Sequence, residues 1–167
     1  MAGPATSSES FLKWTLRPAR PEDANTLASI DAAASAYPWP ESQFISACSS
    51  VSAPQPTSYP ESVQLLEASG EICGFVVYSQ VLDEGSVHNI AVSPPWQGQG
   101  KAGILLQGAL DILLSRDATR CLLEVRESNT AARGLYEHFN FQLDGVRNKY
   151  YPTENGREDA LLMSKLL

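Results

Sequence analysis

The chain is poor in the features that mark membrane and nucleic-acid-binding proteins. None of its apolar runs approaches the roughly 18 residues of a membrane span, and the N-terminal stretch MAGPATSSESFLK lacks the apolar segment of a secretory signal. Lys and Arg number 12 against 19 Asp and Glu, so the net charge is −7. Direct nucleic-acid binding needs clustered basic residues. These absences predict a globular cytoplasmic protein with neither a membrane nor a nucleic acid as its partner.

Cysteine and histidine are also scarce. The three cysteines, Cys48, Cys73 and Cys121, have neither C-x-x-C nor zinc-like spacing, and an odd number is a poor disulfide framework. Two of them lie in apolar runs, which predicts buried thiols in a reducing compartment. The two histidines, His88 and His138, have no partner at a metal-ligand spacing. We therefore expect no metal, and structural or exposed roles for both histidines.

The hydrophobic periodicity predicts one α+β domain. Residues 1–13 are expected to be a flexible lead-in, residues 14–167 the single domain, and the proline-rich segment 49–61 a loop. Alternating and apolar runs predict strands at 14–19, 62–68, 72–82, 86–92, 119–126, 141–152 and 158–167. Spacings near 3.6 residues predict helices at 20–35, 41–48, 101–116 and 128–139, the last stopped by a left-handed Asn140. The order gives a mixed sheet with one β-α-β crossover in its middle.

The glycine-rich stretch GQGKAG, residues 98–103, has the spacing G-x-G-x-x-G. Small residues let backbone amides converge on one point, and the helix that follows adds partial positive charge, so the loop suits a pyrophosphate. A dinucleotide fold would need its first glycine at the end of the first parallel strand. Here SPPWQ intervenes and the preceding strands meander, which disfavours a nicotinamide cofactor.

The same stretch matches the Q-x-x-G-x-[GA] signature of the GCN5-related N-acetyltransferases, and the chain resembles that superfamily from about Trp14 to its C-terminus. The resemblance implies the family's fold, a mostly antiparallel mixed sheet with splayed middle strands and flanking helices. It implies acetyl-coenzyme A as cosubstrate. The residues it assigns to the coenzyme are Ile90, Ala91, Val92, Gln97, Gly98, Gln99, Gly100, Lys101, Ala102, Gly103 and Asn129. The Val92 amide is the candidate donor to the thioester oxygen.

A closer resemblance is to the RimI type, which acetylates the N-terminal alanine of a small-subunit ribosomal protein. Four pieces carry it in order: YPWPESQF (37–44), VLDEGSVHNIAV (81–92), LEVRESNTAARGLYEHFNF (123–141) and NKYYPTENGREDALLM (148–163). Three features depart from the pattern: Ala102 stands where many relatives have glycine, although the motif allows alanine, Asn140 stands where a glycine is usual, and the 49–61 loop is longer. The long loop bears on peptide specificity rather than on chemistry.

Amine acetylation needs a proton acceptor for the ammonium, a donor for the oxyanion and an acid for the thiolate. Glu124, in the apolar strand CLLEVR, is the candidate acceptor. We expect it to be partly buried with a raised pKa, although the residues alone allow an ion pair with Arg126 or a lysine. Tyr136 is the candidate donor, and the alternative for it is core packing. The resemblance favours both catalytic roles.

Other side chains have weaker signals. Asn129 suits a helix cap, and the resemblance adds a contact to the coenzyme arm. Trp39, Tyr150 and Tyr151 either line a peptide groove or pack. Glu158 and Asp159 either attract a basic substrate or are simply solvated.

The expected function is direct transfer of acetyl from acetyl-coenzyme A to the N-terminal α-amine of a protein, most simply an N-terminal alanine of a ribosomal protein. The alternatives are an enzyme of the same fold that acts on a small amine or a lysine side chain, and a non-catalytic coenzyme-binding module. The oligomeric state stays open.

Overall fold

The computed structural model describes residues 13–49 and 60–167, so nearly all of the predicted lead-in and most of the predicted loop at 49–61 lie outside the described residues. The predicted order of elements is confirmed. The strands are β1 (Trp14–Pro18), β2 (Ser62–Ala68), β3 (Glu71–Val81), β4 (Glu84–Val92), β5 (Arg120–Arg126), β6 (Gln142–Thr153) and β7 (Gly156–Leu166). The helices are α1 (Ala24–Ala34), α2 (Glu41–Ser49), α3 (Lys101–Ser115) and α4 (Thr130–His138), with short 3₁₀ turns at Pro21–Asp23 and Pro94–Trp96.

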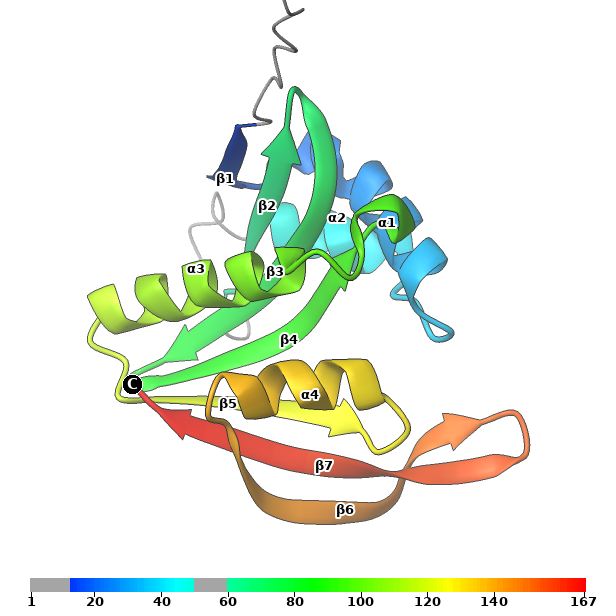
Figure 1. The fold of residues 1–167 in the computed structure, drawn as a ribbon. Coiled ribbons are helices and arrows are strands. Elements are labelled where there is room, and N and C mark those ends of the chain that lie inside the picture. The colour runs from blue at the N-terminus through cyan, green and yellow to red at the C-terminus, as the bar shows by residue number, and fades with distance from the viewer. Residues whose placement is uncertain (1–12, 50–59) are drawn as a thin grey trace, which may run out of the picture.

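The seven strands form one sheet in the order β1-β2-β3-β4-β5-β7-β6. All neighbours are antiparallel except β4 and β5, which α3 connects as a parallel pair. That pair is hydrogen-bonded only from Glu84–Arg120 to Val87–Leu123. Beyond Val87 the two strands separate, and Figure 1 shows them diverging toward their C-terminal ends. The predicted splay in the middle of the sheet is therefore confirmed.

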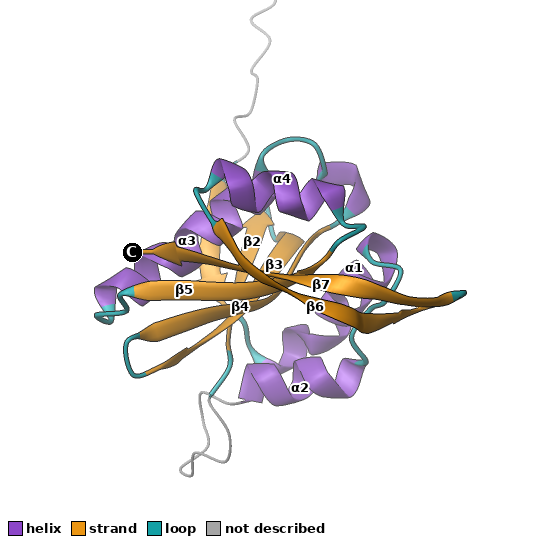
Figure 2. Ribbon diagram, turned by 90° about the horizontal axis from the view of Figure 1, so that it is seen from below, coloured by secondary structure: helices purple, strands orange, loops and turns teal. Residues whose placement is uncertain are grey.

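Helices cover both faces of the sheet. In Figure 2, α3 and α4 lie on one side of it and α1 and α2 on the other. The larger core packs α3 and α4 against the sheet around Leu105, Leu113 and Phe141, and the smaller core packs α1 and α2 around Phe44 and Phe75. Burial of this much apolar surface on both faces holds the two diverging strands at a fixed separation.

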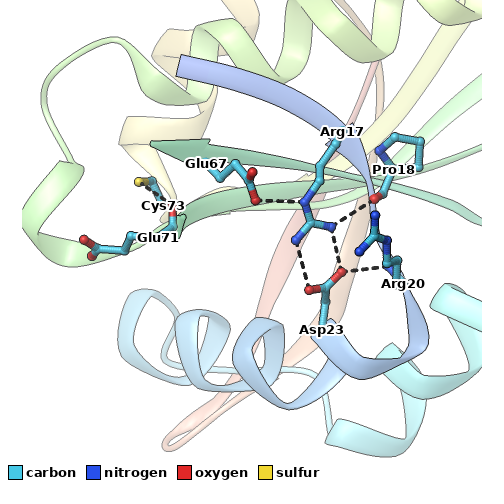
Figure 3. A network of polar contacts seen from close by, with 7 residues as sticks. All are labelled: Arg17, Pro18, Arg20, Asp23, Glu67, Glu71 and Cys73. Carbon is cyan, nitrogen blue, oxygen red and sulfur yellow. Dashed lines mark hydrogen bonds and ion pairs between the residues drawn. The ribbon is translucent and has the colours of Figure 1, made fainter. Parts of the chain in front are cut away.

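An ionic network joins β1, β2 and the turn before α1. The Arg17 guanidinium donates to Asp23 at 2.9 and 3.1 Å and to Glu67 at 2.8 Å, and the Arg20 amide donates to Asp23 at 2.7 Å (Figure 3). The hydrogen bond from Arg17 holds the pKa of Asp23 below its ordinary value. This network anchors the start of α1 to the strands β1 and β2.

Local details agree with the residue types. Asn140 ends α4 with a φ of 65°, the left-handed conformation predicted for it. The first strand of the central pair begins two residues earlier than predicted, at Glu84, because the turn after β3 takes only Leu82 and Asp83.

All three cysteines are buried free thiols, as predicted, and burial raises the pKa of Cys48 to about 11 and that of Cys121 to about 12. Among the described residues, no helix has the length and apolar character to span a bilayer.

Candidate active site

A hollow of about 710 Å³ opens where β4 leaves β5. Its walls are the end of β4, the glycine-rich turn, the start of α3, the segment after α1 and the start of α4. Ten of the eleven residues predicted to hold the coenzyme line it, namely Ile90, Ala91, Val92, Gln97, Gly98, Gly100, Lys101, Ala102, Gly103 and Asn129. The structure therefore brings one strand, one loop and one distant helix together around a single space.

The glycine-rich turn forms one end of this hollow. Gly98 and Gly100 have φ values of 70° and 75°, which side chains with a Cβ rarely adopt. Gly100 is also the N-cap of α3, so the helix points its free N-terminal amides and its positive dipole end at the hollow. Apart from the glycine itself and the chain next to it, no atom lies within 4 Å of where a Cβ would stand on either glycine. Open space in front of converging amides fits the pyrophosphate of coenzyme A.

The polar side chains of the turn mostly brace it. The Gln97 amide group donates to the Val92 carbonyl at 2.8 Å, which ties the turn back to β4. Gln99 donates to the Pro95 carbonyl at 3.0 Å and, alone among the eleven predicted residues, does not line the hollow. The Lys101 ammonium lies 3.7 Å from the centre of the Trp14 ring, so its charge is held at the rim of the site by a cation–π contact.

Asn129 has the capping role that its residue type favours. It is the N-cap of α4, and its side-chain oxygen accepts a hydrogen bond from the Ala132 amide at 3.2 Å. Because Asn129 also lines the hollow, the cap and a contact to the coenzyme arm are compatible at one residue.

A second hollow, of about 450 Å³, is lined by residues of β4, β5, β6, β7 and α2, by Trp39 just before α2 and by Glu61 just before β2. Glu124 lines it, together with Trp39 and Tyr151. Trp39 and Tyr151 are two of the three aromatic residues predicted to line a peptide groove, whereas the third, Tyr150, lines neither hollow and stacks on Arg147 at 3.7 Å. Two further carboxylates, Glu61 and Asp144, give this hollow an acidic wall.

The expected burial of Glu124 is not found. Its side chain is 36% exposed, and its carboxylate accepts a hydrogen bond from the Arg147 guanidinium at 2.9 Å. Arg126, the partner expected from strand alternation, instead pairs with Glu158 at 2.9 Å. The prediction was wrong because the diverging strand leaves Glu124 open to the groove, and because β6 brings an arginine 23 positions away in sequence.

Tyr136 is buried on α4, with its ring 5.8 Å from that of Phe141. Burial raises its pKa, and the neighbouring Cys121 and Tyr151 raise it further. The phenol is therefore held in its protonated form, as an acid must be before it donates. It lines neither hollow.

Arg126 links the elements around the groove. Its guanidinium lies 3.7 Å from the centre of the Tyr37 ring and 4.4 Å from that of Tyr151, and it donates to the Pro152 carbonyl. Glu158 accepts from the Ser128 amide and from Arg126, and hydrogen bonds from Ser128 first and Arg126 second lower its pKa. These contacts join the segment after α1 to the final hairpin.

The two acidic residues of the final hairpin have structural partners. Asp159 accepts from the Lys149 amide at 2.7 Å, at an irregular point in the β6–β7 pairing. Together with the Glu158 contacts described above, this replaces the expectation that both residues are merely solvated or attract substrate. They fix the backbone beside the groove.

Two polar residues that line the hollows, Asp31 and His88, carried no sequence signal strong enough to select them. Asp31, buried on α1, accepts from the Trp39 amide at 2.8 Å and from the Asn89 side chain at 3.1 Å, and burial raises its pKa. His88 lines the second hollow and is hydrogen-bonded to Ser79 at 2.7 Å. A carboxylate on an otherwise apolar helix face was the one available indication for Asp31.

The sequence model of the acetyltransferase (GNAT) family matches residues 24–141, more than half of the chain. The chain belongs to the GNAT family of acetyltransferases. Its acetyl donor is accordingly acetyl-coenzyme A, and the ten lining residues and open glycine turn of the first hollow suit that molecule.

Relatives of this acetyltransferase carry a more specific name. The [ribosomal protein bS18]-alanine N-acetyltransferase of Escherichia coli strain K12 is 40% identical over 135 residues, 81% of this chain and 85% of the relative. The enzyme of the same name from Haemophilus influenzae is 43% identical over 61% of this chain and 69% of its own length. The resemblance to the RimI type is confirmed.

Solved structures show the same fold. The crystal structure of the ribosomal-protein-S18-alanine N-acetyltransferase from Escherichia coli superposes with a TM-score of 0.80 at 36% identity, covering 92% of this chain and 94% of that one. Ard1 from Thermoplasma volcanium superposes with a TM-score of 0.77 at 19% identity, covering 92% and 97%, and shows the fold alone.

Proposed function

We propose that this acetyltransferase transfers the acetyl group of acetyl-coenzyme A to the N-terminal α-amine of a ribosomal protein, with alanine as the acetylated residue, in the cytoplasm. The observation that carries the proposal is the pair of hollows on the two sides of the β4–β5 divergence. The names of the relatives supply the substrate, since ribosomal protein bS18 is what those enzymes acetylate.

The first hollow holds the donor. We assign the pyrophosphate to the amides of the glycine turn and the α3 N-terminus, and the extended arm to the exposed edge of β4 at Ile90–Val92. Past Val87, β4 has no β5 partner among the described residues, so its edge is available to an extended ligand. The Val92 amide is then the donor to the thioester oxygen, which carries negative charge as the amine attacks.

The second hollow receives the peptide N-terminus. An α-ammonium has a pKa near 8, so it must lose a proton before its nitrogen can attack the thioester carbonyl carbon. Glu124 lies in this hollow and is assigned the role of proton acceptor. Its hydrogen bond to Arg147 orients the carboxylate before the substrate arrives, and the acidic wall around it attracts a cationic amine.

The reaction ends when the carbon–sulfur bond breaks and the sulfur leaves as a thiolate. Tyr136 is assigned the role of donating a proton to that sulfur. Its buried, raised-pKa phenol carries a proton at neutral pH, and α4, which holds it, also provides Ala132 and Leu135 to the wall of the donor hollow. The products are an N-acetylated peptide and free coenzyme A, with no acyl-enzyme on the path.

The test is a coenzyme A release assay with hexapeptides. A peptide that begins with a free alanine is expected to be turned over. The same peptide with its N-terminus blocked, the same peptide with a lysine as its only free amine, and a polyamine are expected to be poor substrates. Faster turnover of the lysine peptide or the polyamine than of the alanine peptide would contradict the proposal.

A further inference from the structure

His88 and Glu124 occupy matching places on the two diverging strands. Val87 and Leu123 are the last paired residues of the parallel β4–β5 ladder, and both are buried in the core beneath α3 and α4. His88 and Glu124 follow them directly; alternation along the regular strand β5 turns Glu124 toward the face opposite Leu123. Both line the second hollow. The fold thus places an imidazole beside the proposed proton acceptor, at the point where the sheet opens.

A β-bulge presents His88 to the hollow. In the β3–β4 pairing, Val77 pairs with Asn89 and Tyr78 with Val87, which leaves His88 as the extra residue. Bulges re-aim side chains next to functional sites. His88 is hydrogen-bonded through Nε2 to the hydroxyl of the buried Ser79 at 2.7 Å. The ring therefore lines the groove and is fixed at one end.

Several charged or titratable groups share the hollow with His88. They are Glu61 before β2, Glu124 on β5, and Asp144 and Tyr151 on β6. Asp144 is paired with Arg120 at 2.8 Å and Glu124 with Arg147 at 2.9 Å. Desolvation by the surrounding protein lowers the pKa of His88, and the nearby Glu61 offsets part of that shift. At neutral pH the imidazole is uncharged and has a lone pair available.

We propose that His88 is a second proton acceptor for the substrate ammonium, acting beside Glu124 at the mouth of the β4–β5 divergence. The inference rests on the proposed amine acetylation. In the Nε2–H tautomer the ring donates to the Ser79 hydroxyl, and the Nδ1 lone pair takes one proton from the ammonium. The freed amine lone pair then forms the bond to the thioester carbonyl carbon, and the imidazolium later loses its proton to solvent.

The division between the two groups follows from their ordinary acidities. An α-amine titrates near 8, an imidazole near 6.5 and a glutamate near 4.3, so an imidazole matches the amine better than a carboxylate does. Glu124 is already engaged by Arg147 and provides negative charge for the ammonium. Ser79 acts as a positioning residue, since it holds the ring without reaching the reacting atoms.

The decisive experiment measures kcat and KM of the alanine-initial peptide between about pH 5.5 and 8.5 for the parent, His88→Gln, Ser79→Ala and His138→Gln. We expect His88→Gln to lower kcat about 10-fold at pH 8, with little change in the coenzyme KM. The pKa of His88 is lowered from its ordinary value of 6.5. As the pH falls through that pKa, the ratio of the parent's kcat to the variant's kcat should shrink, because a protonated imidazole cannot accept a proton. The kcat of Ser79→Ala should fall less than that of His88→Gln. The kcat of His138→Gln should equal that of the parent, since His138 lies at the C-terminal end of α4.

Rescue of His88→Ala by added imidazole separates a chemical role from a structural one. Recovery of kcat with rising imidazole supports the proposal. A parent-to-variant ratio that is constant across the pH range, without rescue, would show that His88 only packs, and would overturn it. If the parent itself releases no coenzyme A with the peptide, the proposed function fails first and this inference falls with it.

Discussion

The two hollows on either side of the β4–β5 divergence are built from different parts of the chain. The part of the first, donor hollow that we assign to the coenzyme is formed by a strand edge, a turn with two left-handed glycines and the open N-terminus of α3. The acceptor hollow is made of side chains that several separate segments bring together. A site formed by one turn and the helix after it is encoded by a short sequence motif. A site formed by side chains from distant segments depends on long-range packing, so the hydrogen-bond partners of its residues cannot be read from neighbouring positions in the sequence.

The largest expected effect tests the acceptor hollow through Glu124→Gln. This change keeps the shape of the side chain and removes its capacity to accept a proton, so kcat should fall by about 100-fold, in the range typical of general-base removal. Coenzyme affinity should be unchanged, because Glu124 does not line the donor hollow. Steady-state kinetics and calorimetric titration with acetyl-coenzyme A measure the two separately. A variant as fast as the parent would remove Glu124 from the mechanism.

Gly100→Val tests the donor hollow. A β-branched residue at a φ of 75° is strained by about 1–3 kcal/mol, and its side chain would stand in the open space before the turn. We expect the dissociation constant of acetyl-coenzyme A to rise roughly 30-fold in calorimetry, with some loss of the free energy of unfolding.

The matched control is Gly134→Ala in α4, where φ is not positive and no atom lies within 4 Å of the added Cβ. Alanine there should raise the free energy of unfolding by about 0.5–1 kcal/mol and leave coenzyme affinity unaltered. If Gly100→Val bound the coenzyme as tightly as this control, the turn would not be the pyrophosphate site.

Tyr136→Phe tests a buried tyrosine that lines neither hollow. Phenylalanine preserves the packing against Phe141, so stability should change little, whereas loss of the proton donor should lower kcat about 10-fold. Coenzyme A release assays with the alanine peptide measure the rate, and chemical denaturation measures the stability. A large loss of stability with kcat intact would assign Tyr136 to the core alone.

The smallest expected effects come from two aspartates, one in the donor wall and one outside both hollows. Asp31 has a raised pKa, so its charge opposes folding increasingly as pH rises above the ordinary value of 3.8. Asp31→Asn keeps an oxygen for the Trp39 and Asn89 donors and should leave the free energy of unfolding at pH 7 equal to the parent's or up to about 1 kcal/mol higher.

Asp23→Asn is the opposite case. The pKa of Asp23 is lowered by Arg17, so its stabilisation is present above its ordinary pKa of 3.8 and is lost as pH falls through the still lower folded value. The free energy of unfolding of Asp23→Asn should be about 1–2 kcal/mol below that of the parent at pH 7, and this difference should shrink below about pH 4. Urea denaturation across pH measures both variants. Equal losses for Asp23→Asn and Asp31→Asn would contradict the opposite signs of the two pKa shifts.

Prediction from sequence succeeded where one segment decides the structure. The turn at Gly98–Gly100, the cap at Asn129 and the left-handed stop at Asn140 each follow from a residue type and its immediate neighbours. The order of elements followed from periodicity in the same way.

Prediction failed where distant segments decide it. Pairing of Glu124 with Arg147 depends on the register of β5, β7 and β6, which strand alternation alone does not give. The orientation of His88 depends on a bulge against β3, and such an irregularity leaves no mark in the period-two pattern. The catalytic roles of Glu124 and Tyr136 stay predictions.

The early end of the β4–β5 ladder leaves the central sheet unfinished along one strand edge. The extended arm of acetyl-coenzyme A lying there would pair with the free edge of β4 as an added strand would. Binding of the donor would then extend the hydrogen bonding of the sheet. Amide hydrogens near the end of β4 should then exchange more slowly once acetyl-coenzyme A is present. Since the coenzyme binds the folded state, the free energy of unfolding should also rise with the concentration of acetyl-coenzyme A.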